Sequence, residues 1–191
     1  MFNAKNSAFI AIMAALGNIL AVLSINVAPI ANGVAMDLSH IATFIAAVFG
    51  GPWIGAIVGF SGAIYPGYYF GFLNPTGTLG FLSLVGIPLG KALTGLMAGL
   101  LYRGLKINGS SRPSSYAVPV ILLSYIPECL FTIVYFLYLV VPVVGQGMAF
   151  MLPIILPKAW IEIIMMSFLM GALVGNVGFR DFVARYLSPK P

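Results

Sequence analysis

The sequence predicts an all-α integral membrane protein, a compact bundle of six transmembrane helices with both termini in the cytoplasm. Hydrophobic residues make up 61% of its 191 residues and charged residues only 7%, and the mean hydropathy is +1.06. Because soluble domains carry about 25% charged residues, a soluble fold is excluded. A transmembrane barrel would show strands of about ten residues with alternating polarity, and the sequence shows no such alternation.

Polar and Pro/Gly-rich breaks divide the chain into six apolar segments. The first follows Lys5 as the apolar part of a signal peptide would, but it is nearly long enough to span a bilayer and no A-x-A type cleavage site follows it. We therefore interpret it as the first transmembrane helix. The expected helices, within a single domain over residues 1–191, are roughly 7–25, 34–50, 52–66, 78–102, 116–141 and 154–177.

The basic residues predict the orientation. Six crossings place seven of the nine Lys and Arg residues on one side of the membrane: Lys5, Arg103, Lys106, Arg112, Arg180, Arg185 and Lys190. The first, third and fifth loops contain none, so the positive-inside rule assigns both termini to the cytoplasm. The net charge of +5 does not indicate a nucleic-acid partner, because no patch combines clustered Lys and Arg with aromatic residues.

Small residues recur on one face of several expected helices. In the first helix they are Ala4, Ala8, Ala11 and Ala15, at spacings that share one helical face. Glycines form similar stripes in segments 52–66, 78–102 and 154–177. Such stripes allow close packing of helices in lipid. Two interpretations of the stripes are open. They pack helices together inside the bundle, or a stripe that the bundle does not use internally docks another membrane protein.

Charged residues within the expected helices are the main candidates for a site. Lys91, Glu128, Lys158 and Glu162 lie inside apolar segments, and Asp37 and His40 lie near the outer end of the second. A charge at mid-membrane costs roughly 2.5 to 3.5 kcal/mol, so these groups need partners, water or a ligand. Prolines stand beside three of them, at Pro88, Pro127 and Pro157. Proline interrupts a helix, and interrupted helices often form the binding sites of transporters.

Two interpretations of these charges are open. In the structural one, Lys91 and Glu128 pair between antiparallel neighbours, and Lys158 pairs with Glu162 at i, i+4. In the functional one, the four side chains line a cavity open to the outside, where a substrate with a carboxylate or phosphate would suit the lysines.

The third loop, Pro66 to Gly77, fits a cover for this cavity. Tyr68, Tyr69 and Phe72 would offer stacking faces, and Asn74 and Thr76 hydrogen bonds. The alternative for these aromatic residues is an interfacial belt, where tyrosine is enriched.

No enzyme activity is expected. The stretch Gly59-Phe60-Ser61-Gly62 is similar to the serine motif of rhomboid proteases, but the only histidine, His40, precedes the serine, whereas that chemistry needs a following one. No nucleotide-binding motif is present, and one cysteine, Cys129, gives no cysteine-based metal site. The sequence therefore predicts no catalytic residue, metal or cofactor in this chain.

Three stretches together resemble the substrate-binding S components of energy-coupling factor (ECF) transporters. They are IAIMAALGNIL with Ala11-x-x-x-Ala15, GGPWIGAIVGFSGAI, and GKALTGLMAGLLYR. The resemblance implies capture of a vitamin or similar micronutrient at the plasma membrane of a prokaryote. It implies a transmembrane coupling subunit and two cytoplasmic ATPases as partners, which would use the ATP. Ala11 and Ala15 would contact the coupling subunit, and this smooth face would let the bundle reorient against it.

The alternative is a self-sufficient carrier or channel for a small solute, without ATPase partners. Inverted-repeat symmetry would favour the carrier. No such symmetry is visible, because the first three expected helices hold Asp37 and His40 and the last three hold the other four intramembrane charges.

Overall fold

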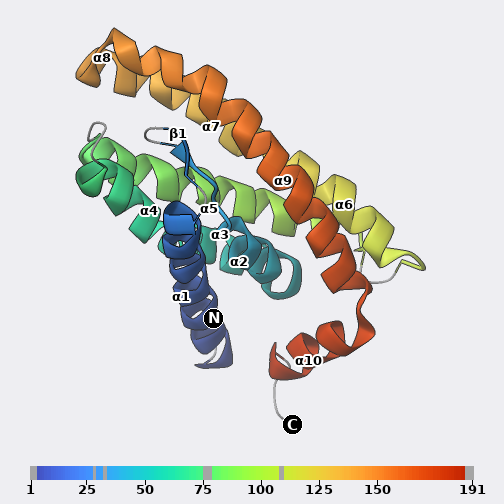
Figure 1. The fold of residues 1–191 in the computed structure, drawn as a ribbon. Helices are drawn as coiled ribbons and strands as arrows, with labels where there is room; N and C mark the ends of the chain where they lie inside the picture. The colour runs from blue at the N-terminus through green and yellow to red at the C-terminus, as the bar shows by residue number, and fades with distance from the viewer. Residues whose placement is uncertain (1–3, 28, 32–33, 75–78, 108–109, 188–191) are drawn as a thin grey trace.

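The chain forms an almost entirely helical bundle (Figure 1). The computed structural model describes residues 4–27, 29–31, 34–74, 79–107 and 110–187. The α-helices are α1 (Ala4–Val27), α2 (His40–Ile45), α3 (Pro52–Ser61), α4 (Ile64–Tyr68), α5 (Phe81–Gly104), α6 (Pro113–Ser124), α7 (Ile126–Tyr135), α8 (Val141–Val144), α9 (Leu152–Gly175) and α10 (Val177–Leu187). Shorter helical turns of other types cover Ala46–Gly50, Tyr69–Leu73, Phe136–Val140 and Gln146–Met151.

Four helical stretches of the described chain are long and apolar enough to cross a bilayer. They are Ala4–Val27, Phe81–Gly104, Pro113–Val144 and Gln146–Gly175. The stretch His40–Gly50 is apolar but shorter. The helical stretch that follows it is interrupted between α3 and α4. The structure therefore supports a helical membrane protein with four candidate spans.

The second expected helix, residues 34–50, is wrong in its first part. Strands β1 (Pro29–Ala31) and β2 (Val34–Ala35) pair antiparallel, and helix begins only at His40. The reason lies in the polar contacts of Asp37. Its backbone N–H donates to Glu162 Oε1 at 2.7 Å, and its Oδ1 accepts from the Ser39 N–H at 2.9 Å. These contacts, which the apolar pattern does not reveal, hold the segment before α2 out of a helix.

The third expected helix, residues 52–66, is also corrected, because it breaks earlier and continues further. α3 ends at Ser61 and α4 begins at Ile64. Asn18 of α1 satisfies the backbone at this break: its amide donates to the Ser61 carbonyl at 2.9 Å and accepts from the Tyr65 N–H at 2.8 Å. Helical structure then runs to Leu73, so most of the expected loop from Pro66 is helical, and residues 75–78 lie outside the described residues.

Small-residue stripes pack three of the helices closely against neighbours. α5 lies among α3, α4, α6 and α7, and its contact with α3 is the most extensive between any two elements. A Cβ atom at Gly55 or Gly59 of α3 would meet the backbone carbonyl of Gly95 or Lys91 of α5. In α9, the Gly171 carbonyl accepts from Ser114 Oγ of α6 at 2.6 Å. Backbone approach of this kind requires glycine.

The stripe of α1 has a different environment. Ala4, Ala8, Ala11 and Ala15 are all exposed, whereas α1 buries Phe9, Gly17, Ala21, Ser24 and Ile25 against the bundle. This stripe therefore takes no part in the internal packing of the described chain.

Both ends of the described chain lie at one end of the bundle (Figure 1). α10, which the sequence did not predict, packs across this end, with Phe179 against Phe49 (ring centroids 5.6 Å apart) and Tyr186 against Phe9 (6.3 Å). Arg103 at the end of α5 donates to the Gly50 carbonyl at 2.8 Å, next to Phe49. Arg103 of α5 and the basic residues of α10 thus gather at the end that holds the termini.

Candidate binding cavity

A cavity of about 640 Å³ lies among α1, α2, α5, α7 and α9. Its walls come from the C-terminal half of α1 (Ala21, Ile25) and the N-terminal halves of α5 and α9. The opposite ends of these same helices carry the N-terminus, Arg103 and α10. The cavity therefore lies in the half of the bundle opposite the termini. Its volume is typical of sites for small molecules, which occupy about 300 to 1,000 Å³.

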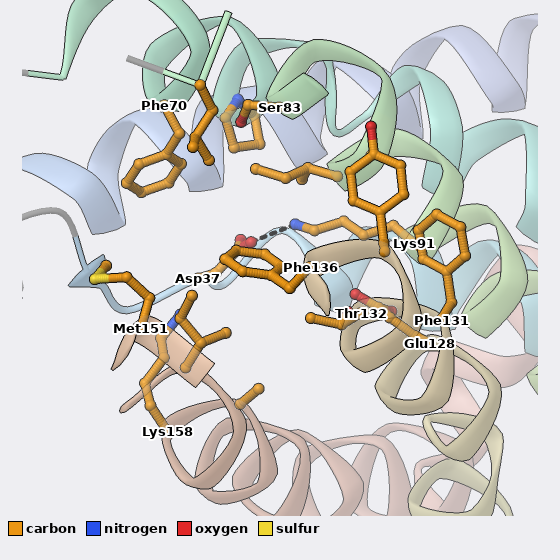
Figure 2. A pocket seen from close by; sticks show the side chains of 18 of the residues that line it. Asp37, Phe70, Ser83, Lys91, Glu128, Phe131, Thr132, Phe136, Met151 and Lys158 are labelled. Atoms are coloured by element: carbon orange, nitrogen blue, oxygen red, sulfur yellow. Dashed lines mark hydrogen bonds and ion pairs between the residues drawn. The ribbon is translucent and has the colours of Figure 1, made fainter. Parts of the chain in front are cut away.

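Lys91 of α5 is buried at the cavity wall and is only 2% exposed. Its Nζ atom donates to Asp37 Oδ2 (Figure 2). It also donates to Ser39 Oγ, in the same segment that precedes α2. Both partners precede Lys91 by more than fifty residues. Lys91 therefore links the segment before α2 to α5.

Glu128 of α7 has a separate set of partners. Its Oε2 accepts from the hydroxyl of Thr94 on α5, and its Oε1 lies 3.5 Å from His40 Nε2 of α2. His40 is buried, stacks on Phe44 and meets the ring of Tyr125 edge-on. Its Nδ1 has no hydrogen-bond partner among the described residues.

Lys158 and Glu162 form a third pair on α9. Lys158 Nζ lies 3.1 Å from Glu162 Oε1, so the pairing expected at i, i+4 is confirmed. The same oxygen accepts from the Asp37 backbone N–H at 2.7 Å. Asp37 therefore joins two ion pairs, through its side chain to Lys91 and through its backbone to Glu162.

The other expected pair, Lys91 with Glu128, is wrong. Both side chains line the cavity, but each has its own partners on α2 or the segment before it. Lys91 and Glu128 are thirty-seven residues apart on different helices, and such a separation does not predict which acid pairs with a lysine. A separation of four residues on one helix does, because it places the two side chains on the same face.

The rest of the wall is mainly apolar. Phe70, Phe131 and Phe136 project into the space drawn in Figure 2, together with Met151. Tyr125 and Tyr135 also line it, and the Tyr135 hydroxyl donates to the Leu82 carbonyl at 2.8 Å. An apolar wall with a few fixed polar groups is the usual composition of a small-molecule site.

The structure brings together most, but not all, of the predicted site residues. Lys91, Glu128, Lys158, Glu162 and Asn74 line the cavity, and Tyr68 and Tyr69 do not. The expectation for these two tyrosines assumed a loop, but the segment is helical. Lining residues of this segment therefore follow a helical spacing of four: Pro66, Phe70 and Asn74. Tyr68 lies on another face and is 46% exposed.

Sequence reasoning missed other lining residues. Asp37 and His40 carried the same signal as the predicted set, because they are polar groups beside an apolar segment. Tyr125, Phe131, Phe136 and the methionines carried no signal, since aromatic and sulfur-containing side chains are ordinary components of a membrane helix. Within the described ranges, no group of three or more His, Cys, Asp or Glu residues is arranged to hold a metal ion.

Ser61, the residue of the protease-like motif, is remote from this site. Its hydroxyl donates to the Ile57 carbonyl one turn earlier at 2.6 Å, and it is not among the lining residues. His40 instead faces Glu128. A serine hydroxyl bonded within its own helix, away from the histidine, has no base to activate it.

Comparison with known proteins agrees with this geometry. The family model of the ECF transporter substrate-specific component matches residues 5–174. The chain belongs to this family. Its members are subunits of transporters, so the resemblance drawn from the three sequence stretches is confirmed. Neither the curated proteins nor the solved structures compared with this S component give a match.

Replacing Thr94 by valine is expected to lower the free energy of unfolding of this S component by about 1 to 3 kcal/mol. Thr94 is fully buried and its hydroxyl donates to Glu128, so valine keeps the shape and removes a donor from a buried carboxylate. Unfolding in mixed detergent micelles measures the change. Thr132→Val is the control, because Thr132 lines the same cavity with no hydrogen bond from its hydroxyl in the described structure. Equal stability of the two variants would contradict the prediction.

Proposed function

We propose that this S component is the substrate-binding subunit of an ATP-driven importer and captures a vitamin or similar micronutrient from outside the cell. The observation that carries the proposal is the cavity. It lies opposite the termini and gathers three of the four acidic residues of a chain with very few charges. Maintaining that many ionisable groups in a membrane bundle is costly, which indicates a functional site.

The proposed orientation in the membrane follows from the positive-inside rule. Basic residues concentrate at the end of the bundle that holds the termini, and this end then faces the cytoplasm. The cavity faces outward in this arrangement. The shorter stretch His40–Gly50 and the interrupted helices α3 and α4 provide the second and third of six crossings. The membrane is the plasma membrane of a prokaryote.

The partners are a transmembrane coupling subunit and two cytoplasmic ATPases, which use the ATP. The exposed stripe of α1, with Ala11 and Ala15 at its centre, supports docking of the coupling subunit, because small residues allow helices to approach closely in lipid. A smooth contact of this kind also permits the bundle to reorient and present the loaded cavity to the inside.

The binding role is tested by mass spectrometry of small molecules retained by the purified chain. Wild type is expected to retain a defined compound through purification or after incubation with a cell extract. The matched control is Ala159→Trp, which places an indole at a half-buried position of the cavity wall and is expected to abolish retention. Failure of wild type to retain any compound more than this variant would refute the proposal. Transport by the chain alone in liposomes would favour a self-sufficient carrier.

The docking role predicts a separation of binding from transport. Ala11→Trp or Ala15→Trp is expected to leave ligand retention unchanged and to reduce both uptake and co-purification of the coupling subunit at least tenfold. The bulky ring holds the helices apart on a surface that otherwise permits close approach. Ala172→Trp on α9 is the control, since Ala172 is also exposed but lies on another helix. Loss of ligand retention in the α1 variants would instead show that the stripe supports the fold.

A further inference from the structure

The charges of the cavity restrict the chemistry of its ligand. We propose that the cavity takes a planar ring compound without an anionic group, and excludes phosphorylated and carboxylate-bearing forms of it. This inference rests on the proposed function, because it describes the substrate of the same site. It departs from the expectation that the lysines bind a carboxylate or phosphate.

Both cavity lysines already have acidic partners within the protein. Lys91 donates to Asp37 and to Ser39, and Lys158 lies 3.1 Å from Glu162. An anionic ligand would either lie beside the carboxylate on the same lysine, where two negative charges repel each other, or displace that carboxylate. The displaced carboxylate would then remain in an apolar wall without its partner, which is strongly unfavourable.

The cavity as a whole also lacks excess positive charge. Its described lining residues include three acids against two lysines and one histidine. The sum is zero if His40 is protonated and negative if it is neutral. In neither state does the cavity attract an anion, and a phosphate group would add up to two further negative charges.

The remaining wall fits a flat ring. Phe70 projects from one side of the cavity, and Phe131 and Phe136 project from α7 and the turn that follows it on the other (Figure 2). Aromatic side chains on facing walls favour stacking on a planar ligand. Met36, Met148 and Met151 complete the wall with flexible, polarisable side chains that adapt to ring edges.

The inference is tested with matched pairs of ring compounds offered to purified wild type in nanodiscs, together with the small-molecule fraction of a cell extract. The pairs are riboflavin with its 5′-phosphate, pyridoxine with its 5′-phosphate, and adenosine with adenosine monophosphate. Mass spectrometry measures the amount of each compound that wild type retains, relative to the amount that the Ala159→Trp control retains. We expect every compound that wild type retains to be a ring compound without phosphate or carboxylate, with at least a tenfold preference within a pair.

Retention of an anionic or acyclic compound by wild type would overturn this inference and leave the proposed binding role intact. Absence of any retention specific to wild type would overturn the binding role, and the inference with it. Asp37→Asn and Glu162→Gln test the cause, since each removes the carboxylate from one lysine. Each is expected to increase the retained share of the anionic member at least tenfold. Unchanged selectivity in both variants, with a neutral ligand still bound, would show that the ion pairs do not set it.

Discussion

Replacing Lys91 by methionine is expected to lower the free energy of unfolding by about 3 kcal/mol, at the lower end of the range for breaking a buried ion pair. Lys91 is almost completely buried, and methionine fills similar space but leaves Asp37 without its cationic partner. The effect stays at the lower end because the Asp37 side chain is 21% exposed and keeps its contact with the Ser39 N–H. Unfolding by denaturing detergent in mixed micelles measures the loss.

Two further variants identify the cause of this loss. Lys106→Met is the matched control, because Lys106 is exposed and surface substitutions usually change stability by less than about 0.5 kcal/mol. The double variant Lys91→Met/Asp37→Asn is expected to recover part of the stability, since it removes the unpaired charge. If the double variant were as unstable as the sum of the two single ones, the contact between Lys91 and Asp37 would not be the source of the effect.

Replacing Gly59 by leucine is expected to have the largest effect on folding. A Cβ atom at Gly59 would meet the carbonyl group of Lys91, so any side chain must push α3 away from the central helix α5. Overpacked cores usually lose about 1 to 3 kcal/mol, and more when side chains cannot relieve the clash. Here the obstacle is backbone, and we expect a loss of more than about 3 kcal/mol. Yield of monodisperse protein and thermal unfolding both report it.

The control for this prediction is Gly104→Leu. Gly104 ends the same central helix, and a Cβ atom there would meet no atom within 4 Å, so the same change of residue type is expected to be tolerated. A Gly59→Leu variant as stable as Gly104→Leu would show that α3 and α5 are not packed backbone to backbone. Ligand retention by a folded Gly59→Leu variant would show that the position of Lys91 is not critical to the cavity.

The ion pairs show how far sequence spacing predicts contacts. The pair of Lys158 and Glu162 was predictable because four residues on one helix bring two side chains to the same face. The partners of Lys91 and Glu128 were not, since Asp37, Ser39 and His40 reach them across the bundle. The burial cost nevertheless identified four residues that line the cavity, because that cost depends on the apolar surroundings and not on the partner.

The aromatic residues show the opposite case. Tyr68 and Tyr69 were predicted at the site because Pro and Gly residues around them indicated a loop. The segment forms a helix to Leu73, which turns Phe70 and Asn74 to the cavity instead. A change in the type of local structure changes which side chains share a face, so Tyr68 and Tyr69 do not line the cavity although other residues of the same segment do.

Composition, the spacing of small residues and the scarcity of charge determined the class of this protein, its family and several of the segments that line the cavity. These properties depend on transfer to lipid and on helical periodicity, which are local. Only the tertiary structure decided which stripe of small residues stays exposed, which acid pairs with which lysine, and where helix α2 begins. Those outcomes depend on contacts between residues distant in sequence, because each helix presents several faces and packing selects among them.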